Sequence, residues 1–139
     1  MYVQGVELYC APTVDDRETW LPTMRTIAIE GRCFVLSACQ YLTRADCPAG
    51  YSGFEDEVLI RGGSCIIDPF GKVLAAPDFS GETIQYAELD RTAIARGKFD
   101  LDVVGHYARP DIFRLNVDTR PRTPVVFGTA ESDQGLFGV

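Results

Sequence analysis

Cysteine and histidine are among the side chains that can act as a nucleophile, a base or a metal ligand. The chain contains five cysteines and a single histidine, His106. No two cysteines form a Cys-x-x-Cys pair, and an odd number of cysteines suits neither a zinc site nor a disulfide framework. Because a free cysteine often serves as a small hydrophobic core residue, we interpret all five as structural.

Two of the cysteines are nevertheless candidates for chemistry. Cys10 stands at the end of a short apolar segment, where a thiol could act as a nucleophile if a base and positive charge lay near it. Cys39 could pair with His106, although their separation in the sequence does not show that they are close. Lys72 and Lys98 are expected to be solvated, in a turn and at a helix end. We therefore assign no catalytic residue to this chain.

The elements that would position these residues alternate between strand and helix. Residues 6–10 and 33–40 are short apolar segments typical of strands, and residues 17–31 between them have a helical pattern. This order predicts a parallel pair of strands with a crossover helix. Ligands of open α/β sheets bind beyond the carboxyl ends of such strands, so the loop 11–16 is the first candidate for a site.

The predicted helix 17–31 has one apolar face, which should pack on the sheet. The residues of this face recur at helical spacing: Trp20, Met24, Ile27 and Ala28. We expect Asp15 or Asp16 to cap the first turn and Gly31 to end the last one. Pro22 is compatible with the helix only if the helix begins near it.

The remaining elements are shorter. Residues 1–5 have helical character that Gly5 should stop, and prolines punctuate an extended tail after residue 100. Between them the sequence predicts a loop at 41–60, a hairpin of strands 64–68 and 73–76, a strand at 83–89, and a helix at 91–98 capped by Asp90.

The composition sets the class of protein and excludes some partners. A chain of 139 residues with 46% hydrophobic and 24% charged residues is typical of one globular domain. The net charge of -7 argues against nucleic acids and anionic membrane surfaces. Neither a membrane-spanning run nor a signal sequence is recognisable, so we expect a cytoplasmic protein.

Several segments of the sequence resemble a known family. In order, they are residues 9–13 (Tyr-Cys-Ala-Pro-Thr), 24–25, 27–41, 61–64, 68–75 and 102–111. Their sequence and order resemble the nitrilases of the carbon–nitrogen hydrolase superfamily, and the resemblance covers most of residues 2–127. Thr26 departs from the pattern, since many nitrilases have a histidine after the Met-Arg pair.

The resemblance implies an α/β fold, the C-terminal half of the four-layer αββα sandwich of nitrilases. Residues 1–127 would be the C-terminal part of the hydrolase domain, and residues 102–127 within them would be an oligomerisation tail. Residues 128–139 lack the match, and we expect them to be a disordered tail.

The resemblance also implies an activity. Nitrilases hydrolyse a nitrile to a carboxylic acid and ammonia through a cysteine thioimidate and thioester, using a glutamate and a lysine but neither a metal nor an organic cofactor. Their cysteine belongs to a Cys-Trp-Glu motif, and no cysteine of this chain is followed by Trp-Glu. The chain would therefore supply pocket wall and subunit interface, and we expect the chain alone to be inactive.

The family pattern assigns roles to particular residues. Pro12, Thr13 and Trp20 would lie at the mouth of the substrate cavity, although Trp20 is equally well interpreted as a core residue of the helix face. Glu30 matches a glutamate typical of the second helix of the superfamily, and we expect it to hold a backbone group or an arginine.

The tail motif suggests contacts between subunits. His106, Tyr107 and Arg109 lie in the part that nitrilases use to pack subunits together, so an interface role is expected. The partners would be a small-molecule nitrile and either a second copy of the chain or a separate N-terminal half that completes the enzyme. The alternative is a non-catalytic, nitrilase-like assembly module. The sequence indicates neither the preferred nitrile nor whether an amide also forms.

Overall fold

The computed structural model describes residues 1–50, 57–120 and 124–125. It divides into two compact units, residues 1–108 and 109–139. The described residues of the second unit contain neither helix nor strand, as the prolines after residue 100 predict. In the described ranges, no helix has both the length and the apolar character needed to span a membrane.

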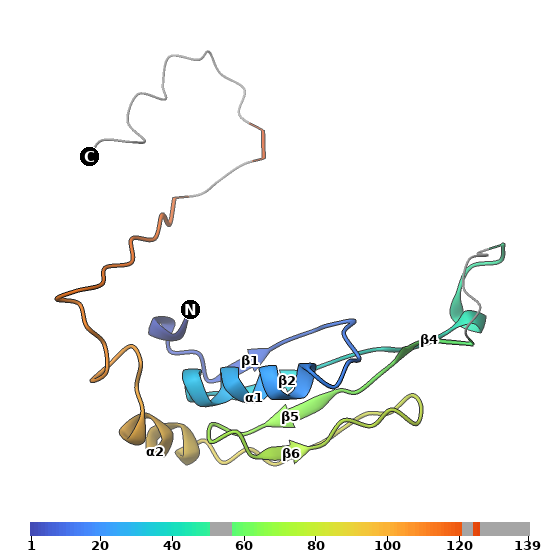
Figure 1. Cartoon of the computed structure of the whole chain (residues 1–139), viewed down its shortest axis with the longest axis horizontal. Coiled ribbons are helices and arrows are strands. Elements are labelled where there is room, and N and C mark those ends of the chain that lie inside the picture. The colour runs from blue at the N-terminus through green and yellow to red at the C-terminus, as the bar shows by residue number, and fades with distance from the viewer. Residues whose placement is uncertain (51–56, 121–123, 126–139) are drawn as a thin grey trace. The chain divides into compact units, whose positions relative to one another are not determined.

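The first unit is built on a four-stranded mixed sheet in the order β1-β2-β5-β6. The strands are β1 (Leu8–Cys10), β2 (Phe34–Ser37), β5 (Cys65–Ile67) and β6 (Val73–Ala75). β1 and β2 are parallel and are joined by helix α1 (Trp20–Gly31), which lies across the sheet in Figure 1. β5 and β6 form an antiparallel hairpin. The predicted crossover and the predicted hairpin are both confirmed.

Helix α1 begins at Trp20, and the predicted capping by Asp15 or Asp16 is wrong. Thr19 occupies the N-cap position without a side-chain capping bond. Asp15 instead accepts the backbone N–H of Arg17 at 3.0 Å. The loop therefore uses its carboxylates to fix its own course before the helix starts.

The two ends of α1 follow from residues with special backbone geometry. Pro22 lies in the first turn, where its missing N–H would have no helical partner. Gly31 is the last helical residue, and Arg32 after it takes a left-handed conformation with φ 46°. A Cβ at Gly31 would lie 2.5 Å from Cε1 of Tyr2, so close packing also requires glycine there.

The sheet separates two apolar clusters. Alternate residues of β2 point to opposite faces, so Val35 belongs to the cluster under α1 and Phe34 to the cluster under helix α2 (Thr92–Asp100). The α1 cluster contains Ala11, Met24, Ala28, Cys33, Val35, Cys65 and Ile67, with Tyr9, Trp20, Leu21 and Ile27 packed against it. The apolar face predicted for α1 is thus confirmed. At the start of α2 the predicted cap is displaced: Arg91 occupies the N-cap position without a side-chain capping bond, and Asp90 before it accepts the N–H of Thr92 at 3.0 Å.

Two predictions about strands are wrong. Within the predicted loop 41–60, β3 (Tyr41–Thr43) and β4 (Val58–Arg61) pair as an antiparallel sheet, because their partners lie far apart in the sequence. Thr43 also forms a capping box with Asp46 in η2 (Arg44–Asp46), which turns the chain after β3. Residues 83–89 form no strand, since no neighbouring strand pairs with them. At the N-terminus, η1 (Tyr2–Gln4) is stopped by Gly5 at φ 73°, as predicted.

The five cysteines have different surroundings, which corrects their common interpretation as core residues. Cys33, Cys39 and Cys65 are buried, whereas Cys10 is exposed and Cys47 is half-buried. Burial raises the pKa of the Cys33, Cys39 and Cys65 thiols. Since the thiolate is the reactive form, these three thiols should react slowly for two reasons: reagents cannot reach them, and they stay protonated.

Native labelling with an aromatic disulfide reagent at pH 8 should therefore modify Cys10 first. Until denaturant is added, the three buried thiols should react at no more than about one tenth of the rate of Cys10, because their labelling requires local opening. Substitution Cys10→Ser should remove the fast phase. Equally fast labelling of Cys33, Cys39 and Cys65 in the native state would contradict the buried sheet.

Candidate functional site

The loop after β1 lies beyond the carboxyl ends of the two parallel strands. The pairing of β1 with β2 continues into it, because Ala11 donates its N–H to the Leu36 carbonyl and Thr13 to the Ala38 carbonyl, both at 2.9 Å. Thr13 also forms an isolated parallel bridge with Cys39. These bonds fix the start of the loop at the edge where open α/β sheets bind ligands.

Two consecutive hydrogen bonds hold the Trp20 side chain on the sheet. Its indole Nε1 donates to Ser37 Oγ at 2.8 Å, and the Ser37 hydroxyl donates to the Ala11 carbonyl at 3.0 Å. Ser37 is buried, and Trp20 is half-buried against the α1 cluster. The indole is thus fixed in orientation, and its exposed part belongs to the surface of the loop.

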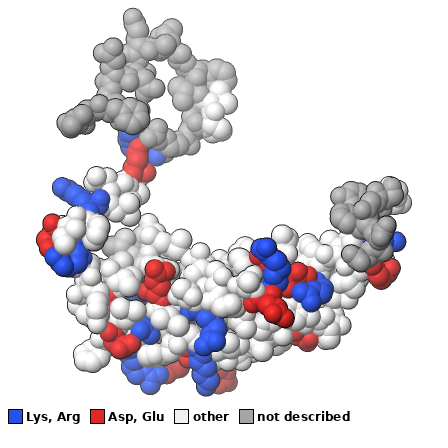
Figure 2. Space-filling view, viewed as in Figure 1, with Lys and Arg blue, Asp and Glu red and all other residues white. Residues whose placement is uncertain are grey.

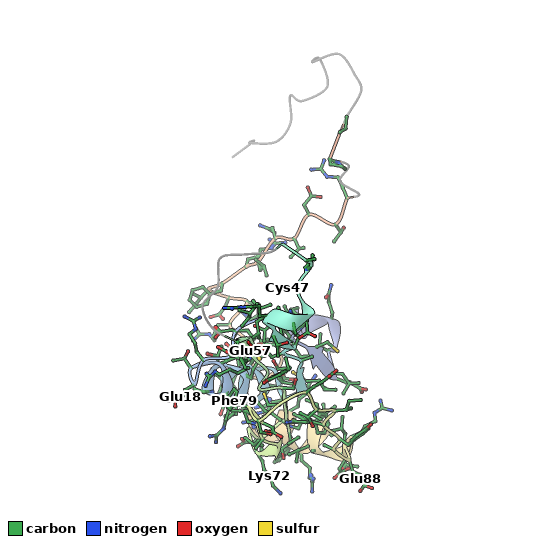
Figure 3. The ribbon with its side chains drawn as sticks, turned by 90° about the vertical axis from the view of Figure 1, so that its right-hand side faces the viewer. Glu18, Cys47, Glu57, Lys72, Phe79 and Glu88 are labelled. Carbon is green, nitrogen blue, oxygen red and sulfur yellow. The ribbon has the colours of Figure 1, made fainter. Side chains whose placement is uncertain are left out.

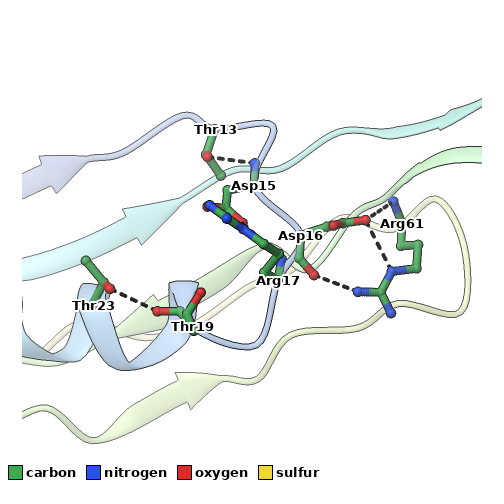
Figure 4. A network of polar contacts seen from close by, with 7 residues as sticks. All are labelled: Thr13, Asp15, Asp16, Arg17, Thr19, Thr23 and Arg61. Carbon is green, nitrogen blue, oxygen red and sulfur yellow. Dashed lines mark hydrogen bonds and ion pairs between the residues drawn. The ribbon is translucent and has the colours of Figure 1, made fainter.

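A polar network shapes the rest of this loop (Figure 4). Thr13 Oγ1 accepts the N–H of Asp15 at 2.9 Å, and the Arg17 guanidinium donates to the Asp15 carboxylate at 2.8 Å. These bonds from Arg17 lower the pKa of Asp15 to about 2. On the face shown in Figure 2, acidic and basic side chains likewise lie beside one another, with uncharged surface between them.

Arg61 ties the loop to β4. The Asp16 carboxylate accepts the backbone N–H of Arg61 at 3.0 Å and its Nε at 3.2 Å, while Arg61 Nη2 donates to the Asp16 carbonyl at 2.8 Å. The bond from the Arg61 backbone is the main cause that lowers the pKa of the Asp16 carboxyl. The Arg61 guanidinium also lies over the ring of Phe79, 5.0 Å from its centroid.

These contacts enclose a pocket of about 260 Å³. It is lined by Asp15, Asp16, Arg17, Glu18, Trp20, Leu21, Gly63, Pro77 and Phe79. Glu18 and Phe79 are close to one another in Figure 3, which looks onto the side of the first unit where the pocket lies. Thr13 lines an open hollow beside the pocket, together with Trp20. Of the three residues predicted to bind substrate, Thr13 and Trp20 are brought together, whereas Pro12 is simply exposed.

Sequence reasoning missed Arg61 and Phe79. Asp16 and Arg61 are 45 positions apart, and no local pattern links them. Gly62-Gly63 immediately after Arg61 was the available signal, because consecutive glycines often mark a close approach of another group.

Residues 1–99 match the carbon-nitrogen hydrolase family. The chain belongs to this family. It is 60% identical over 130 residues to an aliphatic nitrilase of Sinorhizobium fredii (strain HH103), an alignment that covers 91% of this chain and 42% of the relative. It is 50% identical over 141 residues to a bifunctional nitrilase/nitrile hydratase of Lupinus angustifolius, covering 95% of this chain and 40% of that protein.

A solved structure shows the same fold. The carbon-nitrogen hydrolase from Helicobacter pylori G27 superposes with a TM-score of 0.56 at 19% identity, over 72% of this chain and 37% of that one. The chain spans about 40% of the length of the curated relatives it matches. The resemblance to nitrilases is confirmed, as is an α/β fold with a mixed sheet that corresponds to part of a carbon–nitrogen hydrolase.

Glu30, another predicted site residue of this carbon–nitrogen hydrolase chain, is not among the residues that line the pocket. Glu30 is exposed and accepts a hydrogen bond from the Tyr2 hydroxyl at 3.2 Å, where a backbone or arginine partner was predicted. Burial and the nearby Glu30 carboxylate raise the pKa of Tyr2 to about 12. Glu30 thus helps to hold η1 on the end of α1.

The tail motif and the alternative nucleophile pair can also be located. His106 and Tyr107 are exposed, with ring centroids 4.7 Å apart. Arg109, in the second unit, donates from Nε to Asp111 at 2.8 Å. Cys39 is buried and its Sγ is 3.9 Å from the Gln40 carbonyl, so the thiol and the exposed imidazole of His106 have different surroundings.

The two lysines differ from one another. Lys72 is exposed in the turn between β5 and β6, as predicted. Lys98 is half-buried in α2, which corrects the expectation that it is solvated. The α2 helix carries Lys98 close enough to Cys33 for its charge to act on that thiol.

Proposed function

We propose that this chain is part of a nitrilase that hydrolyses a nitrile to a carboxylic acid and ammonia. The observation that carries the proposal is the 60% identity to an aliphatic nitrilase over 130 residues, which covers 91% of this chain. In this role Pro12, Thr13 and Trp20 line the mouth of the substrate cavity. The catalytic cysteine, glutamate and lysine come from outside this chain.

The reaction proceeds by nucleophilic catalysis. A cysteine thiolate attacks the nitrile carbon to give a covalent thioimidate; water and proton transfer then release ammonia and leave a thioester. A second water hydrolyses the thioester to the acid and frees the cysteine. This chain positions the substrate, since Ser37 and Arg61 fix the indole of Trp20 and the course of the loop.

We further propose that the chain assembles with a partner, either a second copy or a separate N-terminal half, into the four-layer αββα sandwich. Exposed apolar side chains support this, since Ile84, Tyr86 and Phe99 are 76%, 81% and 90% exposed. His106, Tyr107 and Arg109 are the residues that we assign to a subunit interface.

A non-catalytic assembly module is the second candidate. The observation in its favour is that none of the cysteines of this chain stands in a Cys-Trp-Glu motif. The two functions predict different behaviour when the missing catalytic part is supplied.

A chimera separates them. The segment of the Sinorhizobium nitrilase that aligns with this chain is replaced by this chain, and ammonia release from aliphatic and aromatic nitriles is measured. The chimera should be active, whereas the 139-residue chain alone should release no ammonia.

The matched control replaces the cysteine of the Cys-Trp-Glu motif in the host part by alanine, which should abolish turnover without changing assembly. A folded chimera that releases no ammonia would favour the assembly module. Turnover by the isolated chain that disappears in Cys10→Ala would instead place the nucleophile in this chain.

A further inference from the structure

The pocket beside the loop contains two aromatic side chains, Trp20 and Phe79. We propose that it is an aromatic slot that binds the flat, uncharged hydrocarbon end of an aryl or arylalkyl nitrile, with Phe79 as a specificity-determining residue. Arg61 acts as a positioning residue for Phe79. The nitrile part of this inference depends on the proposed function, whereas the binding of an aromatic ring does not.

Phe79 is held firmly although it is not covered. Phe79 is 40% exposed, yet the Arg61 guanidinium lies over its ring, 5.0 Å from the centroid. A Cβ at Gly63 would be 2.4 Å from Cε1 of Phe79, so the ring lies directly against the Gly63 backbone. Gly63 in turn donates its N–H to the Asp78 carbonyl at 3.1 Å. An aromatic ring that is fixed by its neighbours and still accessible is suited to ligand contact.

The same arginine connects both sides of the pocket. Arg61 holds Asp16 through three hydrogen bonds and stacks on Phe79, so the loop that leads to Trp20 is tied to the segment that carries Phe79. The pocket is therefore formed before a ligand arrives, which lowers the entropic cost of binding.

The chemistry of the lining favours an apolar ligand. The indole N–H of Trp20 is already bonded to Ser37, so Trp20 offers a ligand only its hydrocarbon surface. Leu21 and Pro77 add further apolar surface. At about 260 Å³ the pocket is smaller than the roughly 300–1,000 Å³ of pockets for drug-sized ligands, which suits a single ring.

The charges at the rim favour a neutral ligand over an anion. Asp15, Asp16 and Glu18 line the pocket with a single cation, Arg17, and Arg17 is paired with Asp15. A carboxylate that enters would meet negative potential. A neutral nitrile is therefore admitted, and the acid formed from it is disfavoured.

Trp20 reports directly on this pocket, because it is the only tryptophan of the chain. The test is a fluorescence titration of the full 139-residue chain with four probes. Phenylacetonitrile and phenylacetamide have the ring with and without a nitrile, phenylacetate has the ring with a negative charge, and butyronitrile has a nitrile without a ring. The two neutral aromatic probes should give a saturable change in Trp20 fluorescence. The affinity for phenylacetate should be lower by about tenfold or more.

Phe79→Ala should weaken the neutral aromatic probes about threefold to tenfold, the range expected from loss of an aromatic contact. Arg61→Gln should weaken them less, through the position of the ring. The matched controls are Phe70→Ala, another exposed phenylalanine beside an arginine, and Arg91→Gln, another exposed arginine paired with a carboxylate. Both controls should bind as the parent chain does.

The outcomes separate the slot from the proposed function. Saturable binding of phenylacetamide that Phe79→Ala weakens supports the slot even if the chimera is inactive on every nitrile. If neither of the two neutral aromatic probes gives a saturable signal, the slot is overturned even if the chimera hydrolyses butyronitrile. Unchanged binding in Phe79→Ala overturns it as well.

Discussion

Replacing Arg32 by alanine should lower the free energy of unfolding by about 2–4 kcal/mol, a large effect for one side chain. The Arg32 side chain is 7% exposed and donates to Asp100 at 2.7 Å and to the Pro69 carbonyl at 3.2 Å. Its guanidinium also lies 5.5 Å from the centroid of the Phe70 ring. Arg32 thus joins the end of α1, the turn between β5 and β6, and helix α2, and alanine would leave these groups without their common partner.

A comparison of alanine with glycine at position 32 separates the side chain from the backbone. Arg32 has φ 46°, a left-handed conformation that costs a residue with a Cβ about 1–2 kcal/mol but costs glycine nothing comparable. Arg32→Gly should therefore be about 1 kcal/mol more stable than Arg32→Ala. Urea unfolding at a fixed protein concentration measures both variants.

Asp100→Asn is the control for the ion pair. Asp100 is 68% exposed, so its charge is screened and its loss should cost less than about 1 kcal/mol. If Arg32→Ala were no less stable than Asp100→Asn, the buried contacts of Arg32 would not be what stabilises this junction.

Position 32 also shows where local sequence rules stop. The sequence predicts that the helix ends at Gly31, because glycine is the usual left-handed residue after a helix. Tyr2 packs against Gly31 so closely that glycine is required there for space, and the left-handed position falls to Arg32. Arg32 tolerates it because its side chain gains buried partners. Only the tertiary contacts reveal this choice.

The elements that were predicted correctly are those whose signals are local. The apolar face of α1 and the stop at Gly5 each depend on residues within a few positions of one another. The turn 69–72 is also local, since Asp68 before it accepts the N–H groups of Phe70 and Lys72. Propensity and capping are properties of short segments, so a single sequence reveals them.

The failures required information from distant residues. Tyr41 pairs with Arg61, and nothing in either segment indicates the other. The apolar residues within 83–89 suggested a strand, but such a segment forms a strand only where a neighbouring strand supplies a ladder. The candidate pocket has the same character, because Trp20 and Phe79 line it together through the contacts of Arg61 with Asp16 and Phe79, and not through their spacing in the sequence.

Gly63→Ala should lower the free energy of unfolding by about 2–5 kcal/mol, the sum of two costs. Gly63 has φ 96°, so a residue with a Cβ is strained there by about 1–2 kcal/mol. The added methyl group would also lie 2.4 Å from Cε1 of Phe79, and overpacking of this kind costs about 1–3 kcal/mol. The displaced ring should weaken binding of neutral aromatic probes as well.

A double-mutant cycle with Phe79→Ala isolates the second cost. Without the ring, Gly63→Ala should cost only the backbone strain of about 1–2 kcal/mol, the same as Gly50→Ala, which has φ 89° and nothing within 4 Å of its added Cβ. The coupling between the two substitutions should therefore be about 1–3 kcal/mol, with the double variant more stable than the sum of the single effects predicts. Urea unfolding of the four proteins measures it. Additive effects would mean that Phe79 moves away from Gly63 at little cost, so that the ring is not fixed on the pocket wall and the slot loses its structural basis.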